Sequence, residues 1–208
     1  MTSIFPETNR GMVLFWYPDL TWGLAYVDAA RLIHLVCVAL GLGTVAFVAM
    51  SVQRMLFEDG SEDSVALLEK AHRQIWLSIG GLWVSGVALV GIRTGFEIAA
   101  FTPKLMMKLV TVTILTADAV LMGRLVTPIL RESRGRALVR LDFPAKFIVA
   151  NCAAISAASW SFALLLGGSS ILKPAGFPAL LTLGAMIYAT AYVFTNAVAI
   201  LSHRMGPA

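Results

Sequence analysis

The sequence predicts an all-α, polytopic membrane protein: a bundle of five transmembrane helices with an N-terminal interfacial segment. Of its 208 residues, 58% are hydrophobic and 13% are charged, whereas a soluble domain carries about 25% charged residues. So few charges cannot cover a water-soluble surface, and so many apolar side chains exclude a disordered chain. Because a bilayer core requires about 20 apolar residues per helix, the length allows at most about six spans.

Five long apolar runs predict the five spans. They cover residues 28–53, 74–95, 104–128, 146–168 and 177–202. Runs of this length are helices, because a membrane-spanning barrel strand is much shorter. Prolines fall at the boundaries of these runs, where they do not interrupt a helix: Pro103, Pro128, Pro144, Pro174 and Pro178. Ser61, followed by Glu62 and Asp63, predicts a second helix that begins near residue 62.

Residues 1–27 are expected to form an N-terminal tail, and residues 28–208 a single five-helix transmembrane domain. Within the tail, residues 11–27 are apolar and aromatic but are interrupted by Pro18 and Asp19. They are therefore predicted to lie at the membrane interface, with a sixth span as the alternative. The first residues are not expected to be a signal peptide, because they lack its basic region.

The basic residues predict the orientation. Ten of the 16 lysines and arginines fall on the side of the first loop, the third loop and the C-terminus, and the other six on the opposite side. Because cytoplasmic loops carry the excess of basic residues, we expect the N-terminus outside and the C-terminus in the cytoplasm. Four arginines of the third loop are expected to set topology and contact anionic headgroups: Arg131, Arg134, Arg136 and Arg140.

The third span carries the most informative polar pattern. Lys108, Thr111 and Asp118 recur at helical spacing and share one face. Asp118 lies roughly 21 Å along the helix, well inside the hydrocarbon, where a carboxyl indicates a functional site. The functional interpretation is a proton or cation relay. The structural alternative is a hydrogen bond to a polar side chain of the fourth or fifth span, namely Asn151, Tyr188, Thr195 or Asn196.

His34 and Cys37 lie three residues apart in the first span and therefore on one face. Soft Cu(I) prefers thiolate, thioether and imidazole ligands, so these two residues and Met107, with its neighbour Met106, are a candidate copper site. The alternative is an interface histidine beside a packing cysteine. A buried bis-histidine haem is disfavoured, because His72 and His203 are expected on the side opposite His34. The sequence identifies no cofactor.

Small residues are abundant in the spans. The fourth span contains ANCAAISAASWS, and the second contains Gly81 and Ser85 four residues apart. Small side chains let helices approach closely in lipid. They predict either ordinary packing within the bundle or a surface on which another membrane subunit docks.

The order of these features resembles that of copper-resistance D-like proteins and related small bacterial inner-membrane proteins of no known role. The resemblance covers residues 28–130 and is carried by RLIHLVCVALGLGT, KAHRQIWLSIGGLWVSGVALVGIRTGF and PKLMMKLVTVTILTADAVLMGRLVTP. It implies a bacterial inner membrane and the handling of copper or haem. The third span carries Asp118 and no histidine, so the functions of these proteins that depend on metal or haem ligands transfer poorly to this sequence.

No motif of a nucleophilic, metal-dependent or nucleotide-binding enzyme occurs, so we expect a non-enzymatic integral inner-membrane protein. The favoured function is an accessory or structural subunit of a larger membrane complex of respiratory or photosynthetic type. The alternatives are a small copper- or haem-handling protein, and a proton- or ion-coupled permease that uses the polar face of the third span. The expected partners are the lipid bilayer and either a membrane subunit or a second copy, but no nucleic acid.

The orientation can be tested by cysteine labelling in intact cells. A cysteine introduced at Gly135 should react only after the cytoplasm is opened, and one at Ser170 should react from outside, because the basic excess lies on the Gly135 side. The reverse labelling pattern would contradict the predicted orientation.

Overall fold

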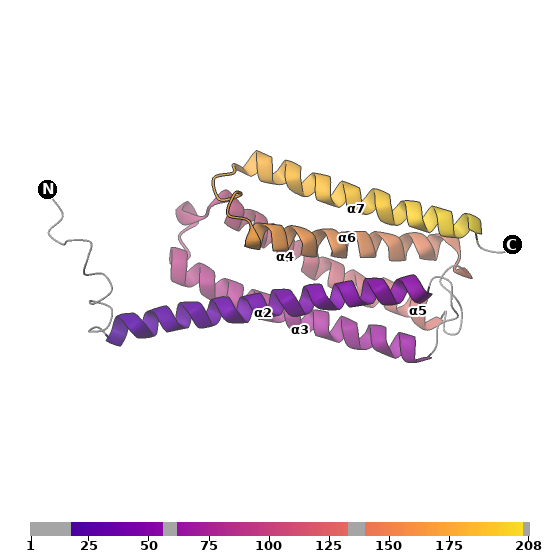
Figure 1. Ribbon diagram of the computed structural model, residues 1–208, viewed down its shortest axis with the longest axis horizontal. Coiled ribbons are helices and arrows are strands. Elements are labelled where there is room, and N and C mark those ends of the chain that lie inside the picture. Colours follow the sequence, from indigo (N-terminus) through magenta and orange to yellow (C-terminus); the bar gives the residue numbers. More distant parts are fainter. Residues whose placement is uncertain (1–17, 56–61, 133–139, 206–208) are drawn as a thin grey trace.

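The computed structural model describes residues 18–55, 62–132 and 140–205, and all of the regular elements within these ranges are helical (Figure 1). The elements follow one another as α2 (Pro18–Met55), α3 (Glu62–Thr94), the short 3₁₀ helix η2 (Ile98–Ala100), α4 (Pro103–Leu121), the π-helix η3 (Met122–Val126), α5 (Thr127–Glu132), α6 (Phe143–Gly168) and α7 (Phe177–Met205).

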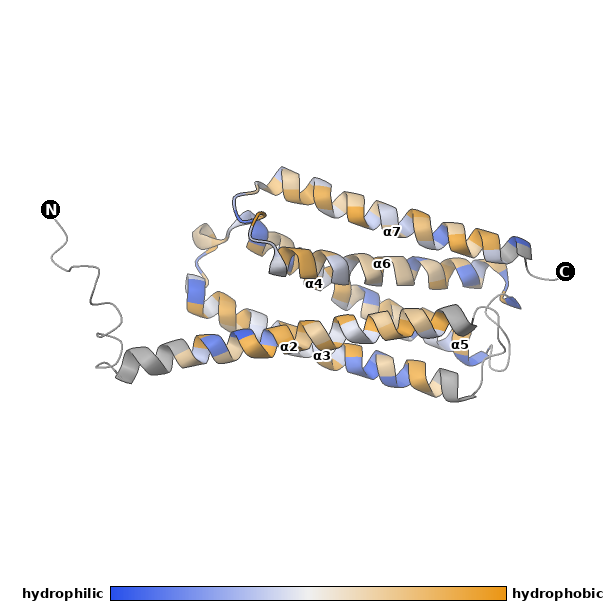
Figure 2. Ribbon diagram, viewed as in Figure 1, coloured by the Kyte–Doolittle hydropathy of each residue, from blue (hydrophilic) through white to orange (hydrophobic). Residues whose placement is uncertain are grey.

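Five helical segments among the described residues are long and apolar enough to cross a membrane, which confirms the predicted fold class. They are Ala25–Val52, Ala66–Thr94, Pro103–Glu132, Phe143–Gly168 and Phe177–Ser202. Hydrophobic positions dominate their middle parts (Figure 2). With an odd number of spans, α2 begins at one end of the bundle and α7 ends at the other (Figure 1).

The helices form two close pairs that a third element connects. α2 packs along α3, and α6 packs along α7. α4 contacts both pairs, mainly through α6 and less through α3. α6 also contacts α2 and η3, and it is the most buried of the five spans.

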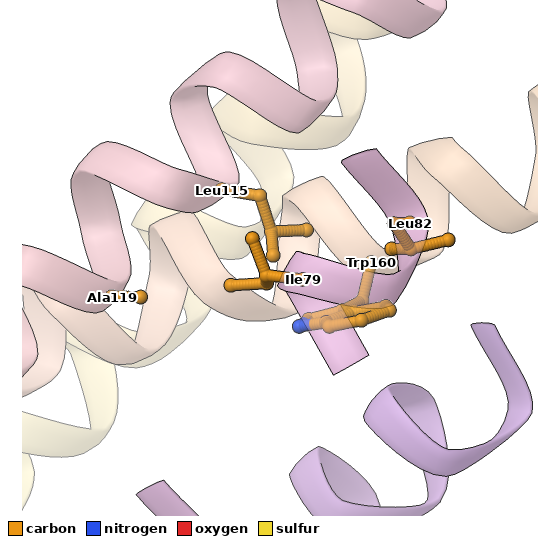
Figure 3. Packing of buried hydrophobic residues seen from close by; sticks show 5 residues of the cluster. All are labelled: Ile79, Leu82, Leu115, Ala119 and Trp160. Atoms are coloured by element: carbon orange, nitrogen blue, oxygen red, sulfur yellow. The ribbon is translucent and has the colours of Figure 1, made fainter. Parts of the chain in front are cut away.

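Trp160 of α6 lies at the centre of the main hydrophobic cluster and is fully buried. Around it pack Ile79 and Leu82 from α3 and Leu115 and Ala119 from α4 (Figure 3). On the α2 side the indole ring lies directly against Gly41, where a Cβ atom would overlap the ring. This cluster therefore joins four helices, and it requires a glycine at its point of closest approach.

The first helix begins earlier than the sequence predicts. The structure has α2 starting at Pro18 and running without a break to Met55, whereas residues 18–27 were assigned to an interfacial tail. Pro18 and Asp19 do not interrupt a helix here; they open one. Proline lacks only an N–H that the first helical residue does not use, and an acidic side chain favours the first turn. Residues 1–17 lie outside the described residues.

The third span also differs from its prediction. It begins as expected, with Pro103 in the first turn and the Thr102 hydroxyl accepting a hydrogen bond from the Leu105 N–H at 3.3 Å. It was expected to end at Pro128 but continues to Glu132. The π-helix η3 precedes this proline, and there both the N–H and the hydroxyl of Thr127 donate to the Met122 carbonyl. The wider turn lets the chain pass a residue that cannot donate its own hydrogen bond.

The Gly41 contact gives a stability test with a matched control in the same helix. Gly41→Ala should lower the free energy of unfolding by about 1–3 kcal/mol, because the new methyl group must displace the Trp160 ring. Gly43→Ala should leave it unchanged or raise it slightly, since nothing lies near its added Cβ and alanine favours a helix. Thermal denaturation in detergent, followed by tryptophan fluorescence, measures both. Equal effects would contradict the packing.

Candidate functional site

Asp118 lies on the buried face of α4, as predicted. Its neighbours on that face, Thr111 and Leu115, are also buried, and Asp118 itself is 3% exposed. The Thr111 hydroxyl donates to the Met107 carbonyl at 2.7 Å, so its donor hydrogen is used within its own helix. Lys108 is only half-buried, and it lies nearly three turns before Asp118, toward the start of the helix. The polar face predicted for the third span therefore divides into a buried carboxyl and a lysine near the helix end.

Ser156 of α6 is the hydrogen-bonding neighbour of the Asp118 carboxyl. One carboxyl oxygen, Oδ1, is buried and has no hydrogen-bond partner within the described part of the chain. A buried polar atom without a partner is unusual, because it loses its hydrogen bonds to water and gains none in return. The carboxyl is therefore buried next to Ser156, with its Oδ1 atom unpaired among the described residues.

The prediction that Asp118 points into the bundle, toward a polar side chain of the fourth or fifth span, is confirmed by Ser156 of α6, but that residue is not among the four candidates named. Asn151 donates to the Phe147 carbonyl at 2.7 Å and accepts a longer bond from Asn196. The Tyr188 hydroxyl lies 2.7 Å from that of Ser159, and Thr195 donates to a backbone carbonyl of its own helix. None of the hydrogen bonds found for these side chains among the described residues reaches Asp118, and the Asn196 Oδ1 atom is itself buried and unpaired. Ser156 is the neighbour of the carboxyl on α6.

Further polar groups of α6 and α7 lie in the neighbourhood of the carboxyl. Cys152 and Tyr188 are both near enough to interact electrostatically with Asp118. Cys152, Ser156 and Ser159 follow one another at spacings of four and three residues, so they lie on one face of α6. We call Asp118, Cys152, Ser156, Ser159 and Tyr188 the polar core. It is contributed by α4, α6 and α7, and within it the Ser159 and Tyr188 hydroxyls lie 2.7 Å apart.

Ser156 is the residue that the sequence analysis missed. The fourth span was recognised for its small residues, but none of them was assigned a polar role. The spacing of Cys152, Ser156 and Ser159 was the available signal, because it places three polar groups on one helical face.

The residues of the predicted copper site are not brought together. His34 Nδ1 lies 2.9 Å from the Ser85 hydroxyl, and the Cys37 sulfur lies against Gly81, so both face α3. Met107 instead packs in a separate cluster of α6 and α7 side chains, with Phe162, Leu166 and Leu180. Met106 is 39% exposed. Within the described ranges no group of three or more His, Cys, Asp or Glu side chains is placed to hold a metal ion.

His72 belongs to a different part of the bundle from His34. Its Nε2 atom accepts a hydrogen bond of 3.0 Å from the Trp76 indole. The same ring faces Gly123 of the π-helix, where an added Cβ would lie 3.1 Å from Nε2. The His203 side chain lies outside the described part of the structure. The two described histidines thus bond to separate partners, Ser85 and Trp76.

Of the four arginines predicted to contact headgroups, Arg131 and Arg140 are among the described residues. Arg131 forms an ion pair with Glu69 of α3, with 2.7 Å between Nε and Oε1, and so fastens α5 to the start of the second span. Arg140 is exposed. Arg134 and Arg136 lie outside the described residues. Contact of these arginines with lipid headgroups stays a prediction.

The five apolar helices and their buried polar core define a multi-pass α-helical membrane protein. No protein-family model, curated protein or solved structure matches the chain. The resemblance to copper-resistance D-like proteins therefore stays a prediction.

The contact between Asp118 and Ser156 can be measured by a double-mutant cycle. Asp118→Leu should lower the free energy of unfolding by about 0.6–2 kcal/mol, the range for hydrogen bonds between membrane helices. Ser156→Ala should cost no more than this, and the double variant should cost less than the sum, because both changes remove one interaction. Unfolding in mixed micelles measures the cycle. Strictly additive effects would show that the two side chains do not interact.

Proposed function

We propose that this protein is a non-enzymatic, proton-coupled permease in which the Asp118 carboxyl takes up and releases the coupled proton. The observation that carries the proposal is a carboxyl buried to 3% exposure with one oxygen unpartnered among the described residues. An aspartate with a purely structural role in lipid is expected to have both oxygens satisfied, because each unpaired polar atom there is costly. An oxygen left free is available to a proton or to a transient water molecule.

The surroundings of the carboxyl support this role. Ser156 of α6 is a hydrogen-bonding neighbour of the carboxyl, and the hydrogen-bonded pair Ser159 and Tyr188 lies on the adjacent helices α6 and α7. Hydroxyl groups both donate and accept, so they can pass a proton to or from a carboxyl. The π-helix begins four residues after Asp118. Turns of this kind occur frequently at functional sites, where the helix must deform.

The membrane and the orientation belong to the same proposal. We place the protein in the inner membrane of a bacterium, with its N-terminus outside and its C-terminus in the cytoplasm. The excess of basic residues around the first and third loops supports the orientation.

A second candidate function is the accessory subunit of a larger membrane complex. A surface groove of about 510 Å³ between α6 and α7 favours it, because small side chains form part of its lining and would let another helix approach. The lining residues are Ala157, Ala158, Ser161, Leu183, Met186, Ile187, Thr190, Ala191 and Phe194. A stable second protein retained through purification in mild detergent, and identified by mass spectrometry, would favour this candidate.

Infrared difference spectroscopy tests the proton-binding role directly, without knowledge of the substrate. The purified protein in lipid should show a protonated-carboxyl band that appears and disappears as the pH is changed. Asp118→Asn should abolish this band, because an amide cannot titrate. Asp142→Asn is the matched control, since Asp142 is exposed at the start of α6, and it should leave the band unchanged.

The same measurement can contradict the proposal. A band assigned to Asp118 that does not respond to pH would make the carboxyl a permanently neutral structural group. Loss of the fold in Asp118→Asn, seen by circular dichroism, would likewise point to a structural role, because asparagine keeps the size and much of the hydrogen bonding of aspartate.

A further inference from the structure

Basic side chains from three helices gather at the end of the bundle where α3 ends and α4 begins. His34 lies on α2, Arg93 in the last turn of α3, and Lys104 and Lys108 in the first two turns of α4. Lys104 and Arg93 are both near enough to repel the Lys108 ammonium, and Lys108 is near enough to repel a protonated His34. We call these four residues the basic cluster.

Two members of the basic cluster are compensated by the chain itself. The Lys104 ammonium donates to the carbonyl of Ser169, at 2.6 Å, where α6 ends. Arg93 lies in the last turn of α3, where the free carbonyls of a helix end favour a cation. The position of these two charges is therefore accounted for by helix C-termini.

Lys108 has no such compensation. It is half-buried within α4, and no hydrogen bond from its ammonium group is found among the described residues. The ion pairs found among the described residues join Arg31 to Asp28 and Arg131 to Glu69, and none of them involves Lys108. A cation that is partly withdrawn from water, close to other cations and without an anion, is unfavourable. An anion from outside the described chain would remove this cost.

We propose that the basic cluster binds a phosphate group at the membrane–water boundary, supplied by the headgroup of an anionic lipid or by free phosphate. Lys108 lies five residues after the start of α4, about 8 Å along the helix, so its long side chain can reach headgroup depth. Basic pockets between membrane helices bind such headgroups. This site does not use Asp118 and goes beyond the proposed permease function.

Lipid binding to the full chain can be measured by native mass spectrometry in detergent, with phosphatidylglycerol as the probe and zwitterionic phosphatidylcholine for comparison. Lys108→Gln should weaken phosphatidylglycerol binding about fivefold or more, the effect of removing one cation near a headgroup. Arg93→Gln should weaken it similarly, and because Arg93 is exposed this variant does not depend on tolerance of a change inside α4. Lys108→Arg should keep the binding.

The matched control is Lys173→Gln, which removes an exposed lysine from the loop that follows α6, where the Lys173 N–H donates to the Ser170 carbonyl. It should change the affinity less than about twofold, because Lys173 is not a member of the basic cluster. Asp118→Asn should also leave lipid binding unchanged. A failure of the permease proposal therefore leaves this measurement intact, and the reverse also holds.

Inorganic phosphate distinguishes the two sources of the phosphate group. If it displaces phosphatidylglycerol and binds lipid-free protein in a manner that depends on Lys108, the site takes free phosphate. If it does neither while the lipid still binds, the site takes a headgroup. Equal phosphatidylglycerol affinity in the wild type, Lys108→Gln and Arg93→Gln, together with no binding of inorganic phosphate, would overturn the proposal.

Discussion

Close packing of α6 against its neighbours is the constraint on which the rest of the bundle depends. In lipid there is no hydrophobic force between helices, so van der Waals contact and interhelical hydrogen bonds must hold them together. The small side chains of α6, such as Ala154 and Ala158, are buried and let α4 and α7 approach. The same helix supplies Trp160 to the main hydrophobic cluster and Ser156 to the Asp118 carboxyl. Packing and polar contacts are therefore built on one helix, and a change in its rotation would disturb both.

Much of the fold could be predicted because lipid imposes length and composition on every span. The second, fourth and fifth helices begin or end where capping residues and prolines indicate, for example at Glu62 and Phe143. The two errors concern proline. Pro18 was interpreted as an interruption and is a helix start, and Pro128 was interpreted as an end and lies inside a span. A proline in a sequence marks a special position, but whether the chain stops there depends on nearby hydrogen bonds such as those of Thr127.

The burial of Asp118 could be predicted from the sequence, but the identity of its partner could not. A carboxyl deep in a span is too costly to face lipid, so the burial of Asp118 follows from the sequence. Its partner does not, because α6 has small residues on nearly every side and tertiary packing alone fixes which side meets α4. Met107 illustrates the same limit. The spacing of His34 and Cys37 gave their common face correctly, but the rotation of α4 directs Met107 toward α6 and α7 instead.

The π-helix between Asp118 and Arg131 has a consequence for how this span can change in evolution. A π-turn is equivalent to one residue inserted into an α-helix, and one residue corresponds to a rotation of about 100°. Asp118 and Arg131 contact different helices, α6 and α3, on either side of this insertion. Deleting one residue from 122–126 would restore a regular helix, but it would turn Arg131 by about 100° relative to Asp118. The two side chains could then no longer face α3 and α6 at the same time. The length of this segment is thus fixed by two partners at once, and tolerated insertions or deletions belong in the loops.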